Sequence, residues 1–263
     1  MILDRFKLTD QVAVVTGAGK GIGRGIAIAF AEAGADVVCA ARTQEDIEET
    51  VAEVEKRGRS GLALRTDVLE EDDRERLIAE AVSRFGRLDI LVNNAGGTPP
   101  RAARDTSVGF FENALRFNVT QAFHLMQLAA PQMVETAGGG AVVNISSRSS
   151  DMVQTAFSSY GAGKAALNMM SRNVAAEWAP RVRVNAISVG GIETEGLALV
   201  LTNEAIRKQF EDNTPMGRPG QVEDIACMAL YLASSASAWV TGKIFQVDGG
   251  AEAPAMSVPV EPL

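Results

Sequence analysis

The stretch Val12–Ala13–Val14–Val15–Thr16–Gly17–Ala18–Gly19–Lys20–Gly21–Ile22–Gly23 decides the fold of this chain. Its first half belongs to an apolar run, Gln11–Thr16, which is typical of a buried strand. The glycines that follow allow a sharp turn and a close approach of the backbone to a ligand. A helix rich in Ile and Ala is expected next, from Gly23 to about Gly34, and the free N–H groups at its start favour a phosphate. The order of strand, glycine turn and helix predicts the first unit of an α/β fold with a phosphate site.

The glycine spacing follows T-G-x-x-x-G-x-G rather than either of two common phosphate motifs. The strict G-x-G-x-x-G spacing is absent, and the Walker pattern fails because Lys20 is followed by Gly21 rather than by Ser or Thr. A glycine-rich turn without a ligand is the competing interpretation. The position between a strand and a helix favours a ligand site, because ligands of α/β folds bind at the carboxyl ends of the strands.

Strands and helices alternate along the rest of the chain. This pattern predicts an α/β, single-domain, doubly wound Rossmann fold with a parallel seven-stranded sheet and helices on both faces. The further strands are expected at Ala35–Ala41, Gly61–Leu64, Leu88–Val92, Ala141–Ile145, Val182–Ile187 and Ile244–Val247, and the further helices at Gln44–Arg57, Glu70–Phe85, Val119–Val134, Ser158–Trp178 and Val222–Ala233. No linker divides residues 1–263. We expect residues 190–219 to bind the substrate, and the proline-containing tail 251–263 to lie over a surface or a neighbouring subunit.

Composition argues against several classes of protein. The 263 residues carry a formal net charge of −8, which is unfavourable for nucleic-acid binding. With two cysteines, Cys39 and Cys227, and one histidine, His124, neither a metal site nor a disulfide framework is expected. Both cysteines lie in apolar runs and are predicted to be reduced core residues, and His124 a packed or interface residue. Without a signal-like start or a long apolar span, a soluble cytoplasmic protein is expected.

The end of the second strand bears on the choice of dinucleotide. An acidic residue there binds the ribose 2′-hydroxyl of NAD, whereas an arginine accommodates the 2′-phosphate of NADP. The chain reads Ala40–Ala41–Arg42–Thr43 at this place, and Lys20 of the glycine turn can approach the same phosphate. Two cations without a carboxylate favour NADP(H), with NAD(H) as the alternative. The competing interpretation is that Arg42 merely decorates the acidic helix that follows.

A tyrosine and a lysine share one helical face further along the chain. Tyr160 precedes Lys164 by four residues, and Ser147 lies thirteen residues before Tyr160. An ammonium beside the phenol is expected to lower the tyrosine pKa from its ordinary value of about 10, so that Tyr160 can give and take a proton near neutral pH. Alone, such a pair is often only a surface pair. Ser146 and Ser149 are rivals of Ser147.

Taken together, these motifs resemble the short-chain dehydrogenase/reductase family, in its shorter branch with T-G-x-x-x-G-x-G and Y-x-x-x-K. The resemblance covers nearly everything from Lys7 to Gly250. The residues that carry it are Thr16–Gly23, Asp67–Val68, Asn93–Asn94–Ala95–Gly96, Asn118, Ser147, Tyr160 with Lys164, and Ile192–Glu193–Thr194. The family spacing to the tyrosine selects Ser147 over its rivals.

The resemblance implies a role for each of these residues. Asp67 and the Val68 backbone would hold the adenine, and Thr194 with the Ile192 backbone would hold the nicotinamide carboxamide. The cofactor site implied in this way consists of Gly17, Lys20, Gly21, Ile22, Gly23, Arg42, Asp67, Val68, Asn94, Ala95, Gly96, Tyr160, Lys164, Ile192 and Thr194. The catalytic residues implied are Asn118, Ser147, Tyr160 and Lys164.

The implied activity is that of an NAD(P)-dependent oxidoreductase that interconverts a ketone and a secondary alcohol by hydride transfer. Ser147 and Tyr160 would donate hydrogen bonds to the carbonyl oxygen, with Tyr160 as general acid/base, and Asn118 would hold a water that links Lys164 to solvent. Mostly apolar loop residues favour a small hydrophobic substrate, steroid-like compounds among them. These residues are Thr98, Pro99, Met152, Val153, Phe157, Leu197, Leu199, Val200 and Met216.

Two other hypotheses stay open: a 3-oxoacyl-[acyl-carrier-protein] reductase and a non-catalytic dinucleotide-binding regulator. The two arginines usual in the carrier-protein enzymes are replaced by Pro131 and Ala176, although Arg116 and Arg172 are candidate substitutes. Val189 stands where the family usually has proline, and a looser loop is expected there. Family members are commonly tetramers built on the helices of residues 119–134 and 158–178, so a homotetramer is expected.

Overall fold

Seven strands form one sheet in the computed structural model, in the order β3-β2-β1-β4-β5-β6-β7. The strands are β1 (Val12–Thr16), β2 (Asp36–Ala41), β3 (Gly61–Arg65), β4 (Ile90–Asn93), β5 (Gly140–Ser147), β6 (Val182–Val189) and β7 (Ile244–Val247). All pairings are parallel, and the strand order reverses between β1 and β4. The predicted doubly wound α/β fold is therefore confirmed. The structure describes the whole chain except residues 256–257 and 262–263 and the side chains of residues 196, 199 and 200.

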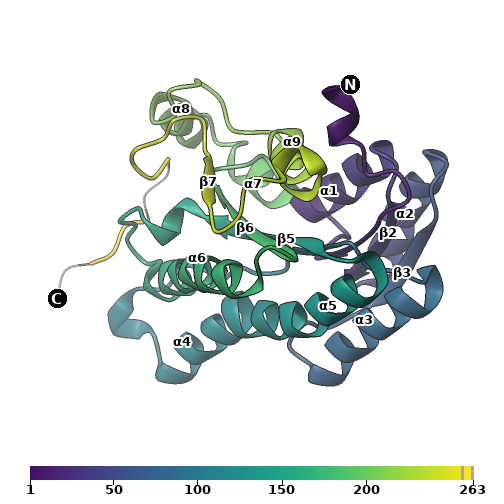
Figure 1. Cartoon of the computed structure of the whole chain (residues 1–263). Helices are drawn as coiled ribbons and strands as arrows, with labels where there is room; N and C mark the ends of the chain where they lie inside the picture. Colours follow the sequence, from purple (N-terminus) through teal and green to yellow (C-terminus); the bar gives the residue numbers. More distant parts are fainter. Residues whose placement is uncertain (256–257, 262–263) are drawn as a thin grey trace.

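Helices cover both faces of the sheet (Figure 1). One layer holds α1 (Gly21–Glu32), α2 (Gln44–Lys56) and α9 (Val222–Ala233), and the other holds α3 (Glu71–Phe85), α5 (Gln121–Ala137) and α6 (Ser158–Trp178). The shorter helices are α4 (Val108–Leu115), which packs against α6, and α7 (Glu195–Val200) and α8 (Glu204–Asp212), which follow β6. No helix within the described residues is long and apolar enough to cross a membrane.

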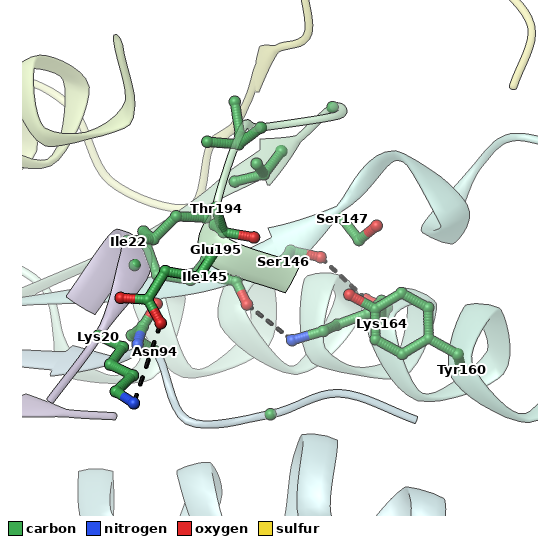
Figure 2. Close-up of a pocket in the computed structure, with 15 residues that line it drawn as sticks. Lys20, Ile22, Asn94, Ile145, Ser146, Ser147, Tyr160, Lys164, Thr194 and Glu195 are labelled. Carbon is green, nitrogen blue, oxygen red and sulfur yellow. Dashed lines mark hydrogen bonds and ion pairs between the residues drawn. The ribbon is translucent and has the colours of Figure 1, made fainter. Parts of the chain in front are cut away.

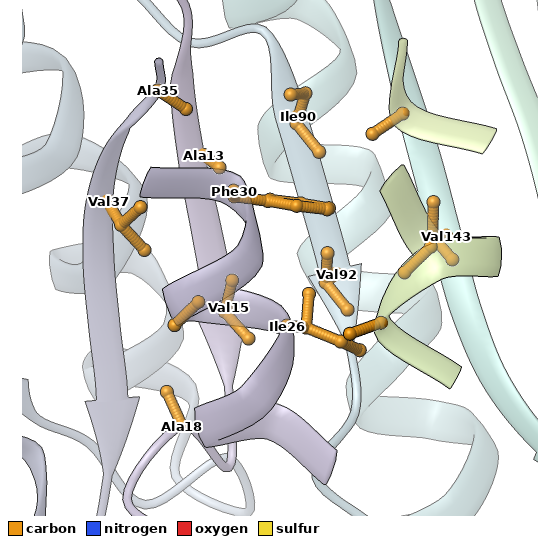
Figure 3. Packing of buried hydrophobic residues seen from close by; sticks show 14 of the residues in the cluster. Ala13, Val15, Ala18, Ile26, Phe30, Ala35, Val37, Ile90, Val92 and Val143 are labelled. Atoms are coloured by element: carbon orange, nitrogen blue, oxygen red, sulfur yellow. The ribbon is translucent and has the colours of Figure 1, made fainter. Parts of the chain in front are cut away.

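Two hydrophobic clusters, one on each side of the sheet, form the core. Ile26 and Phe30 lie one turn apart on α1 and are completely buried (Figure 3). They pack toward the apolar side chains of β1 and β4, such as Val15 and Val92. Burial of a phenylalanine side chain contributes about 1.5–3 kcal/mol, so this contact anchors the helix that follows the glycine turn. The core thus fixes where the turn lies relative to the sheet.

Three helices were absent from the sequence prediction: α4, and α7 and α8 within residues 190–219. Helix α4 begins at Val108 with Ser107 as its N-cap, whose side chain accepts a hydrogen bond from Phe110 N at 3.2 Å. Gly109 lowers the helix propensity of this short segment, which hides it from pattern analysis. A π-helical turn, Arg116–Thr120, joins α4 to α5. The prediction that Cys227 is a core residue is wrong: Cys39 is buried in β2, but Cys227 is exposed on α9 because it falls on the solvent side of that helix.

Val189 does not loosen its segment as expected. It ends β6 in register with both Ser147 of β5 and Val247 of β7, and it is buried. The next residue continues the pairing, since Gly190 N donates to Val247 O at 3.0 Å. Valine keeps a backbone N–H and fits a central strand, which proline does not. The strand therefore extends as far as the catalytic serine predicted from the sequence.

Candidate active site

The predicted site residues follow the carboxyl ends of the strands, which meet at one edge of the sheet. Gly17 follows β1, Arg42 follows β2, Asp67 lies two residues after β3, Asn94 follows β4 and Ser147 ends β5. The strand order reverses between β1 and β4, where an open α/β sheet forms a crevice for its ligand. The fold therefore brings together residues that are far apart in the sequence.

The glycine turn is held rigidly against the end of β4. Gly17 has a positive φ of 65°, and Asn94 Nδ2 donates to Thr16 O at 2.9 Å and to Gly17 O at 3.2 Å. A Cβ atom on Gly23 would collide with the Gly17 carbonyl and the Asn94 amide. Thr16 Oγ1 accepts hydrogen bonds from the backbone N–H groups of Asn94 and Ala95, both at 3.0 Å. Asn94 therefore braces the turn as well as lining the site.

Thr50 holds the other side of the turn and was missed by the sequence analysis. Its buried hydroxyl lies 2.9 Å from Ala18 O and 3.0 Å from Asp46 O. One side chain thus joins the glycine turn to the first turns of α2. A threonine inside a helix gives no sequence signal for such a role, because its partner lies 32 positions away.

A pocket of about 220 Å³, here called the edge pocket, lies beside the glycine turn. It is lined by Gly17, Gly19, Lys20, Ala41, Arg42, Thr43, Asp46, Thr66, Asp67, Val68, Ala95 and Phe117. Asp67 is fixed there because its Oδ1 accepts from Leu69 N at 3.0 Å. The buried Arg74 donates from Nη1 to Val68 O at 2.7 Å. The polar groups of this pocket therefore have fixed positions.

The charges of the edge pocket differ from the sequence expectation in one respect. Lys20 and Arg42 both line it, as predicted, but so does a carboxylate, Asp46. Lys20 Nζ lies 3.5 Å from Asp46 Oδ1 and 3.9 Å from Glu195 Oε2. The end of β2 carries no acid, as predicted, whereas Asp46 comes from the first turn of α2. The expectation of cations without a carboxylate is therefore wrong.

A larger cavity of about 480 Å³, here called the central cavity, continues from the glycine turn to the end of β5 (Figure 2). Lys20, Gly21 and Ile22 lie at one end, and Ser147, Tyr160 and Lys164 at the other. Asn94, Gly96, Ile145, Ser146, Val189, Gly190, Ile192, Thr194 and Glu195 complete the wall. Tyr160 and Lys164 project from α6 toward the end of β5.

The geometry favours Ser147 over the rival serines. Ser146 Oγ donates to Lys164 O at 3.4 Å inside the protein, and Ser149 Oγ donates to Gln154 Oε1 at 2.9 Å. Ser147 Oγ accepts from Ser149 N at 3.2 Å, which leaves its O–H free to donate. Ser147 and Tyr160 both line the central cavity.

Burial controls the protonation of the tyrosine and the lysine. Burial raises the pKa of Tyr160, and the nearby Ser147 hydroxyl opposes this shift only in part. The expected lowering of the tyrosine pKa is therefore not found in the protein alone. Burial also lowers the pKa of Lys164 from 10.5 to about 8. Lys164 Nζ donates to Ile145 O at 2.8 Å and lies 5.7 Å from the centre of the Tyr160 ring.

Asn118 lies in the π-helical turn and is almost completely buried. Its Nδ2 donates to Ala114 O at 2.9 Å and to Thr98 Oγ1 at 3.0 Å, and its Oδ1 accepts from Gly97 N at 2.9 Å. A Cβ atom on Gly96 would lie 3.0 Å from Asn118 Oδ1 and 3.1 Å from Lys164 Nζ. The close approach of these three residues depends on Gly96, and it brings Asn118 next to the lysine.

A third pocket, here called the tail pocket, opens from the central cavity. Its volume is about 210 Å³, and Ser147, Val189 and Gly190 line both spaces. Met152, Phe157 and Leu197 line it as predicted, together with Ala253, Pro254 and Ala255 of the C-terminal tail. Of the other predicted wall residues, Val153 is 93% exposed, Met216 lines a different pocket, and the side chains of Leu199 and Val200 lie outside the described residues. The tail covers a surface of its own chain.

One group of side chains in the described part of the chain has the composition of a metal site: Glu71, Glu75 and His124. Arg74 Nε donates to His124 Nδ1 at 2.9 Å, so the neutral imidazole carries its proton on Nε2. That nitrogen faces Glu71 Oε1 at 4.0 Å, and a protonated nitrogen cannot bind a metal. The arrangement suits a packed histidine that pairs with a carboxylate.

Comparison with known proteins agrees with this geometry. Residues 17–252 match a family model described as enoyl-(acyl carrier protein) reductase. The 7alpha-hydroxysteroid dehydrogenase of Escherichia coli K12 is 40% identical, over 94% of this chain and 96% of that protein. A solved 7alpha-hydroxysteroid dehydrogenase, in complex with NADH and 7-oxoglycochenodeoxycholic acid, has a TM-score of 0.90 at 40% identity and covers 95% of this chain and 97% of its own. A gluconate 5-dehydrogenase from Burkholderia cenocepacia, in complex with NADP and tartrate, has a TM-score of 0.88 at 33% identity, over 95% and 98% of the two chains.

Proposed function

The chain belongs to the short-chain dehydrogenase/reductase family of oxidoreductases, and from this premise we propose that it interconverts a ketone and a secondary alcohol with NADP(H) as the preferred cofactor. The observation that carries the proposal is the central cavity, which joins the glycine turn to Ser147, Tyr160 and Lys164. It is one continuous space with a phosphate site at one end and proton donors at the other.

The residues present fit a dinucleotide. The glycine turn leaves no room for side chains at Gly17 and Gly23, and its helix presents free N–H groups to a phosphate. Asp67 and Val68 in the edge pocket would hold the adenine, and Ile192 and Thr194 in the central cavity would hold the carboxamide. When bound, the nicotinamide supplies or accepts the hydride.

The side chains of the cavity handle the proton and the developing charge. Ser147 and Tyr160 donate hydrogen bonds to the carbonyl oxygen, which stabilises the negative charge that grows on it. Tyr160 then gives its proton to that oxygen, or takes it back in alcohol oxidation. Protonated Lys164 stabilises the phenolate that forms, and Asn118 beside it would hold a water that carries the proton to solvent.

The preference for NADP(H) rests on two cations at the edge pocket. Lys20 and Arg42 both line it, and each can approach a 2′-phosphate. Asp46 opposes them, because its carboxylate pairs with Lys20 and would repel the phosphate. Solved relatives bind NADH in one case and NADP in another. Arg42 is the residue that favours NADP(H) here, since none of its guanidinium nitrogens lies within 4.0 Å of a carboxylate oxygen among the described residues.

The tail pocket supports a small hydrophobic substrate. Met152, Phe157 and Leu197, which the sequence predicted as substrate contacts, line this pocket and are apolar. Ser147 lines it as well. The steroid skeleton of the ligand in the solved hydroxysteroid dehydrogenase agrees with a hydrophobic substrate, although that ligand also carries a carboxylate. A single domain, with residues 190–219 as its substrate-binding region, a homotetrameric assembly and a cytoplasmic location belong to the same proposal.

The proposal is tested by following NADPH oxidation over a panel of ketones. The panel contains cyclic ketones, keto steroids, a sugar keto acid and an acyl-carrier-protein thioester. We expect turnover of neutral hydrophobic ketones. Turnover of the carrier-protein substrate alone would support the 3-oxoacyl reductase instead, and tight NADPH binding without any turnover would support the non-catalytic regulator.

A further inference from the structure

Arg148 directly follows Ser147 and is buried in a junction of three segments. Its Nη1 lies 2.7 Å from Asp151 Oδ2, its Nε lies 2.7 Å from Asp248 Oδ2, and its Nη2 donates to Ala251 O at 3.2 Å. Asp248 follows β7, and Ala251 begins the C-terminal tail. One side chain therefore ties the end of β5 to the end of β7 and to the start of the tail.

The junction is built for a guanidinium. The side chains of Arg148 and Asp248 are each only 10% exposed, so each needs a partner of opposite charge. Arginine can serve three acceptors at once through its rigid fork, whereas lysine is a single point charge. Nη1 and Nη2 form hydrogen bonds, whereas Nε is a buried partner of Asp248 in an ion pair without hydrogen-bond geometry. Since two carboxylates already neutralise this guanidinium, it is poorly suited to bind the carboxylate of an acidic substrate.

The tail that Arg148 holds forms one side of the tail pocket. Ala253, Pro254 and Ala255 line the pocket together with residues such as Phe157. Two further contacts hold the tail in place: Asn213 Nδ2 donates to Ala255 O at 3.3 Å, and Thr155 Oγ1 donates to Val258 O at 2.5 Å. Small side chains on the tail side leave the space in which a substrate bound at Ser147 would extend.

We propose that Arg148 is a positioning residue that fixes Ala251–Ala255 as a wall of the substrate site, and that this wall sets the size of neutral substrate the enzyme accepts. The inference rests on the proposed function, because it assumes that the tail pocket receives the ketone. Arg148 itself does not touch the reacting atoms in this account.

The wall is tested with Ala255→Trp, which fills the tail pocket, and with Val260→Trp as the matched control on the exposed part of the same tail. Affinity for a keto steroid is measured by calorimetry on NADP⁺-loaded enzyme, so that the result does not depend on turnover. We expect Ala255→Trp to weaken steroid binding by about tenfold or more, with NADP⁺ affinity unchanged and with cyclohexanone reduction less affected. Equal steroid affinity in the two variants, or no steroid binding by the wild type, would overturn the inference.

The role of Arg148 is tested separately by hydrogen exchange. In Arg148→Lys the charge remains but the three-way contact is lost, so we expect the amides of residues 251–255 to exchange about tenfold faster. If the amides of residues 251–255 exchange at the wild-type rate in Arg148→Lys, Arg148 does not position the tail. A failure of the proposed function would differ from both results, since it would show as steroid binding without reduction of any ketone.

Discussion

At the scale of one residue, the burial of the Lys164 ammonium lowers the stability of the folded protein. The ammonium is buried, and among the described residues its one hydrogen bond is to Ile145 O. Burial lowers its pKa to about 8, which means that the folded protein disfavours the charged form. The unfolded chain has no such penalty. The charged Lys164 therefore lowers the stability of the folded protein at neutral pH.

The expected consequence is that Lys164→Met stabilises the cofactor-free protein near neutral pH. The pKa of Lys164 is lower in the folded state than the ordinary 10.5, so its cost is full below about pH 8 and disappears as the pH rises past 10.5. After the lost hydrogen bond is subtracted, we expect a gain of about 2 kcal/mol in the free energy of unfolding. Urea unfolding near pH 7 and near pH 10 measures this, and the gain should shrink at the higher pH. A variant less stable than wild type at both values would contradict the burial argument.

The proposed preference for NADP(H) depends on Arg42, again at the scale of one residue. Arg42→Asp should weaken NADPH binding by about tenfold or more, because it replaces a charge-assisted contact with the 2′-phosphate by repulsion. NADH affinity should be kept or improved. Arg84→Asp makes the same change of charge on the exposed face of α3 and is the control. Equal affinities of the wild type for NADPH and NADH, measured by fluorescence titration, would refute the preference.

The sequence predicted which residues meet in the site but not how their environment acts on them. Tyr160, Lys164 and Ser147 follow from spacing, because the helix and the strand end determine their positions. The pKa of Tyr160 depends on burial by segments from elsewhere in the chain, so its direction was predicted wrongly. Asp46 was missed because it reaches the edge pocket from a neighbouring helix turn rather than from the strand end.

At the scale of elements, the glycine turn is a rigid unit held by Asn94 and Thr50. Gly23→Ala should reduce NADPH affinity by at least about tenfold and lower the stability by about 1–3 kcal/mol, because its Cβ would push the Gly17 carbonyl and the Asn94 amide out of place. Gly109→Ala is the matched control, since a Cβ there meets no atom within 4 Å. Thermal melting and NADPH titration report both effects. Equal behaviour of the two variants would show that the turn is not tightly packed.

Most strands and long helices could be predicted because a parallel sheet buries continuous apolar runs and its helices bury one face. Helix α4 was missed because it is short and carries Gly109 near its start. The well-ordered strand pairing of Val189 was also not predicted. Its partner strand β7 comes from much later in the chain. The local sequence pattern gives no information about contacts between segments that are far apart in the chain.

At the scale of the whole molecule, exposed apolar side chains indicate where copies of the chain would meet. Phe123 and Val134 on α5 and Met169 on α6 are 39%, 40% and 53% exposed. These are the helices from which the homotetramer was predicted. Light scattering at micromolar concentration should give the mass of four chains, and Met169→Glu should lower it, because a charge would be buried in the interface. Ile2→Glu, at an exposed residue of the N-terminal segment, is the control. A monomeric wild type would contradict the prediction.

The central claim is that Tyr160 gives the proton to a carbonyl oxygen while the rest of the cavity holds the cofactor. The most direct measurement compares NADPH affinity and ketone reduction in the wild type and in Tyr160→Phe, on the best ketone of the panel. We expect an NADPH dissociation constant within about twofold of the wild-type value and a loss of about 100-fold or more in kcat/KM. Reduction by Tyr160→Phe at the wild-type rate, with the same affinity for NADPH, would contradict the account.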